Sequence, residues 1–200
     1  METLSVAEIA QALGGRYNRN AEITSICIDT REVVPGSLFI AIKGERFDGH
    51  DFIPKAFELG ATAVISHKAV VFDKPVIYVP DTRRAFLQLA AWYRRRYQIF
   101  MAAVTGSVGK TSTKDMIYTV LSSKYNTLKT QGNFNNEIGL PKTLLRLDGS
   151  YQAAVIEMGM SGFGEISKLS KAVCADVGVI TNIGVSHIEK LGSRENILQT

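Results

Sequence analysis

The stretch AAVTGSVGKTSTKD, Ala102 to Asp115, constrains the fold more than any other part of the chain. An apolar run, Ile99 to Val104, predicts a buried strand, and a glycine-rich turn and a predicted helix from Lys110 to Ser122 follow it. Glycine lets backbone N–H groups converge on an anion, and a helix start adds unpaired N–H groups and its positive dipole end. Strand, turn and helix in this order therefore predict an α/β domain with a phosphate site where the strand ends.

The loop departs from the common phosphate-loop pattern, which has a glycine five positions before the Gly-Lys-Thr. That position is Val104, still inside the predicted strand, so the loop is a shorter one, TGSVGKT. We expect Lys110 to place its ammonium on the outer phosphates of ATP and Thr111 to place its hydroxyl on Mg²⁺. The alternative is an ordinary strand-to-helix turn with a coincidental Lys-Thr pair. The residues expected to contact the nucleotide are Gly106, Ser107, Val108, Gly109, Lys110, Thr111 and Ser112.

Composition narrows the class of protein. The 200 residues are 46% hydrophobic and 21% charged, as in ordinary globular proteins. The chain has no apolar run long enough for a membrane span, and its first residues lack the basic head and apolar core of a signal peptide. A net charge of +4 suits a phosphorylated ligand but is too small to indicate nucleic acid. Cys27 and Cys174 both lie in apolar stretches, so we expect reduced thiols in a cytoplasmic protein. We also expect a monomer.

Hydrophobic periodicity divides the chain at about residue 82. Before that point, short helices and β-branched runs predict a small α/β domain, residues 1–82, which opens with a capping box from Ser5 to Glu8. Residues 83–97 have the spacing of a linking helix, and Asp51 to Leu59 predicts a further helix in the first domain. Beyond the linking helix, continuous apolar strands alternate with helices, which indicates a mostly parallel sheet covered on both faces, in a domain of residues 83–200.

Polar side chains follow two strands of the second domain. Glu157 ends the strand AAVIEMG, and His187 follows the strand DVGVITNIG. The carboxyl ends of parallel strands meet at one edge of a sheet, where ligands bind. A carboxylate there is a candidate Mg²⁺ ligand. The alternatives are a solvated strand-end Glu and a structural His.

Two further loops carry polar candidates. Asn133, Asn135 and Asn136 crowd one loop beyond what a single turn requires. In the first domain, Thr30 and Arg31 follow one predicted strand, and the Lys43-Gly44 pair follows another. Arg and Lys suit a diphosphate, and the alternative is charged loops in water.

Three stretches resemble the Mur ligases, enzymes that build the peptide of bacterial cell-wall precursors. TGSVGKTSTK resembles their ATP loop, and TQGNFNNEIGLPKTLLRL, Thr130 to Leu147, resembles the MurF type of the family. IDTREVVPGSLFIAIKGERFDGHDF, Ile28 to Phe52, is similar to the family's nucleotide-sugar-binding domain. The resemblance extends from about Leu4 to Thr200.

The resemblance implies an ATP- and Mg²⁺-dependent amide ligase of peptidoglycan precursor synthesis. In the MurF type, the terminal carboxylate of UDP-MurNAc-tripeptide becomes an acyl phosphate, which the amine of D-alanyl-D-alanine attacks. By resemblance, Lys110, Glu157 and His187 are catalytic, and Thr111, Glu157 and His187 hold Mg²⁺. The substrate-binding residues that the resemblance implies are Thr30, Arg31, Gly44, Glu45, Arg46, Phe47 and Asn136.

Two other functions stay open at this point. One is a related Mur-type ligase that adds a different amino acid, and the other is a P-loop protein that binds nucleotide without ligation. Family members are far longer and have a third domain and a modified lysine shortly after the metal-binding His. The chain ends at Thr200, before such a lysine, so we expect a UDP-binding domain, an incomplete ATP-binding domain and little ligase activity from these residues alone.

Overall fold

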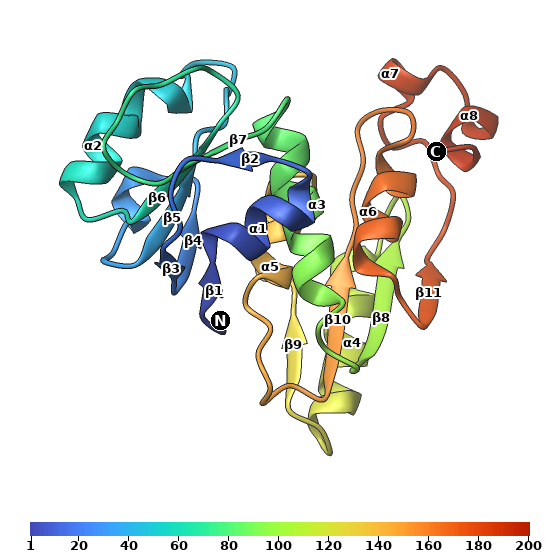
Figure 1. Ribbon diagram of the computed structural model, residues 1–200. Coiled ribbons are helices and arrows are strands. Elements are labelled where there is room, and N and C mark those ends of the chain that lie inside the picture. Colours follow the sequence, from blue (N-terminus) through green and yellow to red (C-terminus); the bar gives the residue numbers. More distant parts are fainter. The chain divides into compact units, whose positions relative to one another are not determined.

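The computed structural model describes residues 1–200, which form two compact units, unit 1 (Met1–Leu89) and unit 2 (Ala90–Thr200). Each unit combines a mainly parallel sheet with helices (Figure 1), so the predicted α/β class is confirmed. One helix, α3 (Thr82–Arg94), contains the point in the sequence where the units divide. None of the helices has the length and apolar character that crossing a bilayer requires.

Unit 1 is built on a five-stranded sheet in the order β2-β7-β6-β5-β4. Strands β4 to β7 are parallel, and β2 pairs antiparallel at one edge. A two-stranded sheet joins β1 to β3. The elements are β1 (Leu4–Ser5), α1 (Val6–Leu13), β2 (Arg16–Tyr17), β3 (Glu22–Ile23), β4 (Ser25–Cys27), η1 (Thr30–Glu32), β5 (Ser37–Ile40), η2 (Gly49–Phe52), α2 (Ile53–Glu58), β6 (Ala63–Ser66) and β7 (Val76–Tyr78).

Local sequence signals explain the helix boundaries in unit 1. The predicted capping box is confirmed, because the Glu8 N–H donates to Ser5 Oγ over 3.1 Å and the Ser5 N–H donates to Glu8 Oε2 over 2.8 Å. The helix predicted from Asp51 to Leu59 is wrong at its start. Asp48 instead caps a 3₁₀ turn, and α2 begins only at Ile53, where Pro54 fixes a helical φ in the first turn.

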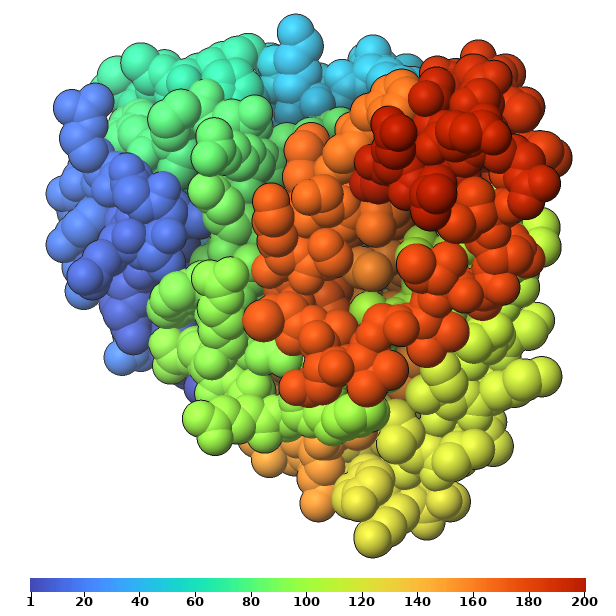
Figure 2. Space-filling model, turned by 90° about the vertical axis from the view of Figure 1, so that its right-hand side faces the viewer, coloured from blue at the N-terminus to red at the C-terminus, as the bar shows by residue number.

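Unit 2 is built on a four-stranded parallel sheet in the order β11-β8-β10-β9. The segments that follow β10 and β11, orange to red, form a large part of the surface shown in Figure 2. The elements of this unit are β8 (Phe100–Thr105), α4 (Lys110–Ser122), β9 (Thr127–Lys129), α5 (Gly139–Leu144), β10 (Ala153–Glu157), α6 (Glu165–Val173), β11 (Val177–Ile180), α7 (Ile188–Leu191) and α8 (Arg194–Leu198).

The strand β8 lies between β10 and β11 and leads directly into the glycine loop. Val104 is fully buried and lies opposite Glu157 of β10 and Val179 of β11 in the strand register. Burial of a valine side chain contributes about 1.5–3 kcal/mol to folding. A core cluster centred on Ala102, Val104 and Val155 receives the apolar face of α4. This packing fixes the helix start beside the ends of β8 and β10.

Gly139, at the start of α5, lies against the backbone of the preceding loop. A Cβ atom added to Gly139 would lie 2.4 Å from the Phe134 Cα, whereas one added to Gly149 would have no heavy atom within 4 Å. Neither glycine has a positive φ. The positive-φ constraint is therefore absent at both positions, and the room for a Cβ atom differs sharply between them.

We predict that Gly139→Ala destabilises the protein by about 1–3 kcal/mol, because backbone atoms of Phe134 must move away from the added Cβ atom. Thermal unfolding should show a midpoint lower by roughly 3–10 °C. Gly149→Ala is the matched control and should leave the midpoint unchanged within about 2 °C. Equal midpoints for the two variants would contradict the close approach at Gly139.

Candidate active site

The loop from Thr105 to Gly109 turns the chain from β8 into α4. Gly106 has a φ of 136° and Gly109 a φ of 82°, values that residues other than glycine rarely adopt. A Cβ on Gly106 would also lie 2.1 Å from Thr181 Oγ1. No side chain caps α4, so the first helical N–H groups, from Lys110 to Ser112, are left for another acceptor. This end of α4 has the properties of an anion site.

The segment after β11 braces the loop from one side. The Ser107 N–H donates to the Asn182 carbonyl over 3.1 Å, and the Val108 N–H donates to Asn182 Oδ1 over 3.2 Å. Ser186 Oγ donates to the Ser107 carbonyl over 3.1 Å, and the Gly184 N–H donates to Ser107 Oγ over 2.8 Å. Two of the loop amides that the sequence assigns to phosphate are therefore bonded to Asn182 in this structure.

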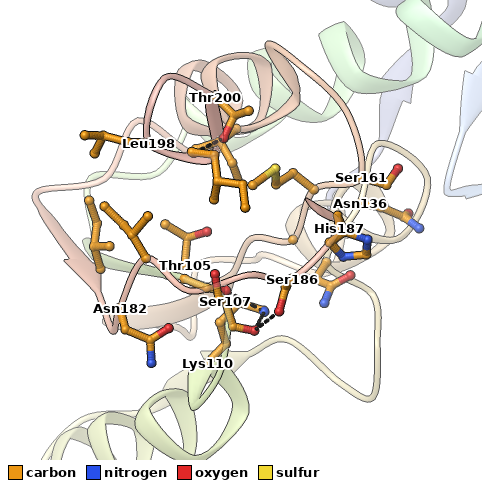
Figure 3. A pocket seen from close by; sticks show the side chains of 18 residues that line it. Thr105, Ser107, Lys110, Asn136, Ser161, Asn182, Ser186, His187, Leu198 and Thr200 are labelled. Carbon is orange, nitrogen blue, oxygen red and sulfur yellow. Dashed lines mark hydrogen bonds between the residues drawn. The ribbon is translucent and has the colours of Figure 1, made fainter. Parts of the chain in front are cut away.

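Lys110 lies over the loop, where its ammonium donates to the Gly106 carbonyl over 2.6 Å and contacts the Ser107 carbonyl at 3.3 Å. The same side chain lines a pocket of about 320 Å³. Figure 3 shows Ser107, Lys110 and Ser186 together at one end of this pocket, with Leu198 and Thr200 at the other. The other lining residues include Asn135, Asn136, Met160, Ser161, Ile166, Ile180, Asn182, Ile183, His187 and Ile197.

Glu157 ends β10 with a buried side chain that several partners orient. The Thr111 hydroxyl donates to Oε2 over 3.0 Å, and Asn135 Nδ2 donates to Oε1 over 2.9 Å. The Glu157 N–H donates to Thr130 Oγ1 over 3.0 Å. The strand, the helix start and the asparagine loop therefore meet at one carboxylate, which is 2% exposed.

The Thr111–Glu157 pair fits a Mg²⁺ ion. Mg²⁺ takes octahedral oxygen ligands at about 2.0–2.1 Å, so neighbouring ligands lie roughly 2.9 Å apart. Thr111 Oγ1 and Glu157 Oε2 are 3.0 Å apart. His187 is exposed in the pocket wall, at the start of α7, and no contact joins it to Glu157. No three His, Cys, Asp or Glu side chains cluster as metal ligands, so His187 as a ligand stays a prediction.

The asparagine loop divides its roles between neighbouring residues. Asn136, which the sequence favours, accepts the Ile138 and Gly139 N–H groups through Oδ1 at 3.0 and 2.8 Å, at the start of α5. It also lines the pocket. Asn135 makes the contact to Glu157, a role that the sequence analysis missed. The only signal for it is the unusual density of asparagines in this loop.

Unit 1 has a second candidate site beside the predicted UDP-binding loops. A pocket of about 550 Å³ is lined by Lys43, Gly44, Glu45, His67, Pro80, Asp81, Thr82 and Arg83. Gly44 and Glu45 therefore reach this pocket, whereas Thr30, Arg31, Arg46 and Phe47 are not in its lining. Arg31 pairs with Asp29 inside its own turn. His67 and Arg83 are lining residues that the sequence analysis did not select.

A partly buried polar network adjoins this pocket through His67. His50 Nδ1 lies 2.6 Å from Asp48 Oδ1, and the Lys68 ammonium donates to Asp48 Oδ2 over 2.7 Å. The His50 and His67 rings are in contact, with centroids 4.1 Å apart. Hydrogen bonds from Lys68 and from the His50 backbone N–H hold the pKa of Asp48 far below its usual value. Desolvation lowers the pKa of His67, so its neutral form is favoured.

Comparisons with known proteins identify the family to which both parts of the chain belong. A family model described as the Mur ligase middle domain matches residues 104–200, and one described as Mur ligase family, catalytic domain, matches residues 22–101. The chain belongs to the Mur ligase family. The resemblance carried by the three sequence motifs is thereby confirmed. The similar proteins described next are of the MurF type.

Individual Mur ligases match over nearly the whole chain. The UDP-N-acetylmuramoyl-tripeptide–D-alanyl-D-alanine ligase of Bacillus subtilis (strain 168) is 49% identical over 199 residues, which are 98% of this chain and 44% of that protein. The crystal structure of MurF from Acinetobacter baumannii aligns with a TM-score of 0.94 at 37% identity, over 99% of this chain and 45% of that one. MurF of Thermotoga maritima, in complex with ADP, aligns with a TM-score of 0.83 at 38% identity, over 88% and 41%. The chain thus spans less than half the length of these relatives.

We predict that Asp48→Asn lowers the thermal midpoint at pH 7 by roughly 3–6 °C, because charge-assisted hydrogen bonds are lost. The folded pKa of Asp48 lies below its unfolded value, so the carboxylate stabilises the fold above the unfolded pKa. This stabilisation begins to decrease as the pH falls below about 4, and it is lost only as the pH falls through the much lower folded pKa. The gap between the midpoints of Asp48→Asn and the original protein should therefore stay constant from pH 7 to about pH 5 and begin to narrow between pH 4 and pH 3. A gap that stays constant down to pH 3 would argue against the ionic role.

Proposed function

We propose that the protein is the ATP-dependent ligase that joins D-alanyl-D-alanine to the terminal carboxylate of UDP-MurNAc-tripeptide. The observation that carries the proposal is the glycine loop with the Thr111–Glu157 pair, beside a pocket at the carboxyl ends of the strands. A relative named for this reaction, the Bacillus subtilis ligase, matches 98% of this chain. In that relative the complete activity belongs to a protein more than twice as long as this chain.

The chemistry requires an activated carboxylate. ATP supplies it by transferring its γ-phosphoryl group to the carboxylate, which gives an acyl phosphate and ADP. The amine of D-alanyl-D-alanine then attacks the carbonyl carbon, the C–O bond to phosphate breaks, and an amide and inorganic phosphate result. Phosphoryl transfer depends on positioning and on cations that neutralise the phosphate oxygens.

In this proposal, the loop and the helix start position the nucleotide. The N–H groups at the start of α4 bind phosphate oxygens, together with N–H groups of the loop residues from Gly106 to Gly109. Lys110 moves its ammonium from the Gly106 carbonyl onto the outer phosphates, a short change because the side chain already lines the pocket. The Ser107 and Val108 N–H groups and the Lys110 ammonium thereby exchange internal hydrogen bonds for bonds to phosphate.

Thr111 and Glu157 would hold one Mg²⁺ ion. The ion would neutralise phosphate charge during transfer. Asn135 would keep the carboxylate oriented from its other oxygen. We keep His187 as the candidate ligand of a second ion and Asn136 as a candidate substrate contact, since both line the pocket next to Lys110.

The pocket in unit 1 is the proposed anchor for the UDP part of the substrate. Lys43 and Arg83 bring cationic groups to it, and the start of α3 adds its dipole. Gly44 and Glu45 line it directly. Thr30, Arg31, Arg46 and Phe47 stay proposed contacts for the remainder of the sugar nucleotide. Such an anchor contributes binding energy remote from the reacting carboxylate.

Two assays on the whole protein, rather than on these 200 residues alone, separate this proposal from its alternatives. ADP release should rise only when UDP-MurNAc-tripeptide and D-alanyl-D-alanine are supplied together. Turnover that ignores both substrates would favour a P-loop protein without ligase activity. A panel of amines, each offered with UDP-MurNAc-tripeptide and the corresponding shorter precursors, would identify a related ligase that adds another amino acid.

We predict that Lys110→Ala lowers ligation by at least about 10³-fold, because one cation at the transferring phosphate is lost. Calorimetry should show binding of UDP-MurNAc-tripeptide unchanged within about threefold. Lys124→Ala is the control, since Lys124 lies just beyond the other end of α4, over the Tyr125 ring. Equal loss of ligation and UDP-substrate binding in Lys110→Ala would mean that the two units have been assigned wrongly.

We predict that Thr111→Val raises the Mg²⁺ concentration for half-maximal ligation by about 10–100-fold, since a metal ligand is replaced by a methyl group. Thr111→Ser keeps the hydroxyl and should stay within about threefold of the original protein. Mg²⁺ titrations at saturating ATP measure both values. An unchanged Mg²⁺ requirement in Thr111→Val would remove Thr111 from the metal site.

A further inference from the structure

Lys114 occupies a position of α4 where helical spacing predicts an apolar residue. Ile117, Tyr118 and Leu121 follow it by three, four and seven residues, and they pack on the core cluster of β8 and β10. Lys114 lies on the same face, and its side chain is only 4% exposed. Burial of an ammonium group is unfavourable unless an opposite charge lies beside it.

Glu157 is the group whose charge Lys114 balances. The Lys114 Nζ lies 3.6 Å from Glu157 Oε2 and 3.7 Å from Asp115 Oδ1. The Glu157 side chain is 2% exposed, whereas that of Asp115 is 47% exposed and already pairs with Lys129 over 2.8 Å. Water screens Asp115, but only protein groups surround Glu157.

Different residues balance the charge of the Glu157 carboxylate and donate a hydrogen bond to its Oε2 atom. At 3.6 Å, Lys114 is beyond hydrogen-bond distance from Oε2, which accepts the Thr111 hydroxyl at 3.0 Å instead. Thr111 and Lys114 are three residues apart on α4 and so approach the carboxylate from one helix face. Lys114 therefore balances the charge without displacing the hydroxyl.

We propose that Lys114 is a positioning residue that holds the charged Glu157 carboxylate against Thr111 until a divalent cation binds there. The cation brings its own positive charge to the same carboxylate and takes over part of the stabilisation. Loss of Lys114 should then be most damaging without a divalent cation and largely repaired with one. This inference rests on the proposed role of Glu157 as a Mg²⁺ ligand.

The test compares thermal unfolding of the whole protein with ADP plus EDTA and with ADP plus Mg²⁺. In EDTA, Lys114→Met should lower the midpoint on the order of 10 °C, because it leaves a buried carboxylate without a counter-charge. Mg²⁺ should restore at least half of that loss, a larger increment than in the original protein. An increment equal to that of the original protein would overturn the proposal.

Two further variants bracket this result. Lys114→Arg keeps the charge and should retain most of the EDTA stability. Lys129→Met removes the lysine that pairs with Asp115 and not with Glu157. It should shift the midpoint by less than about 3 °C and leave the Mg²⁺ increment unchanged. A Lys129→Met response equal to that of Lys114→Met would show a general charge effect and overturn the proposal.

The double variant Lys114→Met/Glu157→Gln covers the case in which Lys114→Met does not fold. Removing both charges should recover folding in EDTA, with a midpoint equal to or above that of Glu157→Gln alone, which leaves Lys114 buried without its partner. A loss equal to the sum of the two single losses would overturn the pairing but leave the metal site standing. Conversely, a Glu157→Gln variant with the original Mg²⁺ increment would remove Glu157 from the metal site and so contradict that part of the proposed function.

Discussion

The interaction on which unit 2 depends is the burial of the Glu157 carboxylate at the end of β10. Its neighbours come from two other segments: Thr111 and Lys114 from α4, and Asn135 from the loop before α5. A buried carboxylate is stable only when its oxygens are hydrogen-bonded and its charge is balanced. The same requirement fixes the start of α4 and the asparagine loop relative to the sheet. The Gly159 N–H adds a bond of 2.7 Å to the Asn135 carbonyl, so this loop is held at two points.

A second set of contacts closes the glycine loop against the end of β11. Asn182 receives the N–H groups of Ser107 and Val108, and it follows an edge strand that pairs only with β8. The loop is therefore shaped before any nucleotide binds. Nucleotide binding would exchange these internal bonds for bonds to phosphate, at a helix start whose own N–H groups have no side-chain cap. The same connection places Ser186 and His187 in the pocket beside Lys110.

Local signals were sufficient to predict part of this arrangement. The helix from Lys110 to Ser122 and the capping box at Ser5 occur as predicted, because spacing and caps act within a few residues. Glu157 could be chosen because it ends an apolar strand. Asn135 could not be separated from Asn136, since both are loop residues of one type and only packing decides which reaches the carboxylate. Lys114 escaped notice because a lysine on a helix is ordinarily solvated, and the sequence does not reveal its distance from Glu157.

The sequence by itself determined the α/β class and the short glycine loop between β8 and α4, with Lys110 at the start of the helix. These features depend on backbone conformation and on apolar periodicity, both of which are written into neighbouring residues. The tertiary structure alone decided which polar groups share a partner. Loop amides bond to Asn182, a buried lysine faces Glu157, and His67 and Lys43 line one pocket. These partners are distant in sequence, so their charges and hydrogen bonds act only after folding has packed them together.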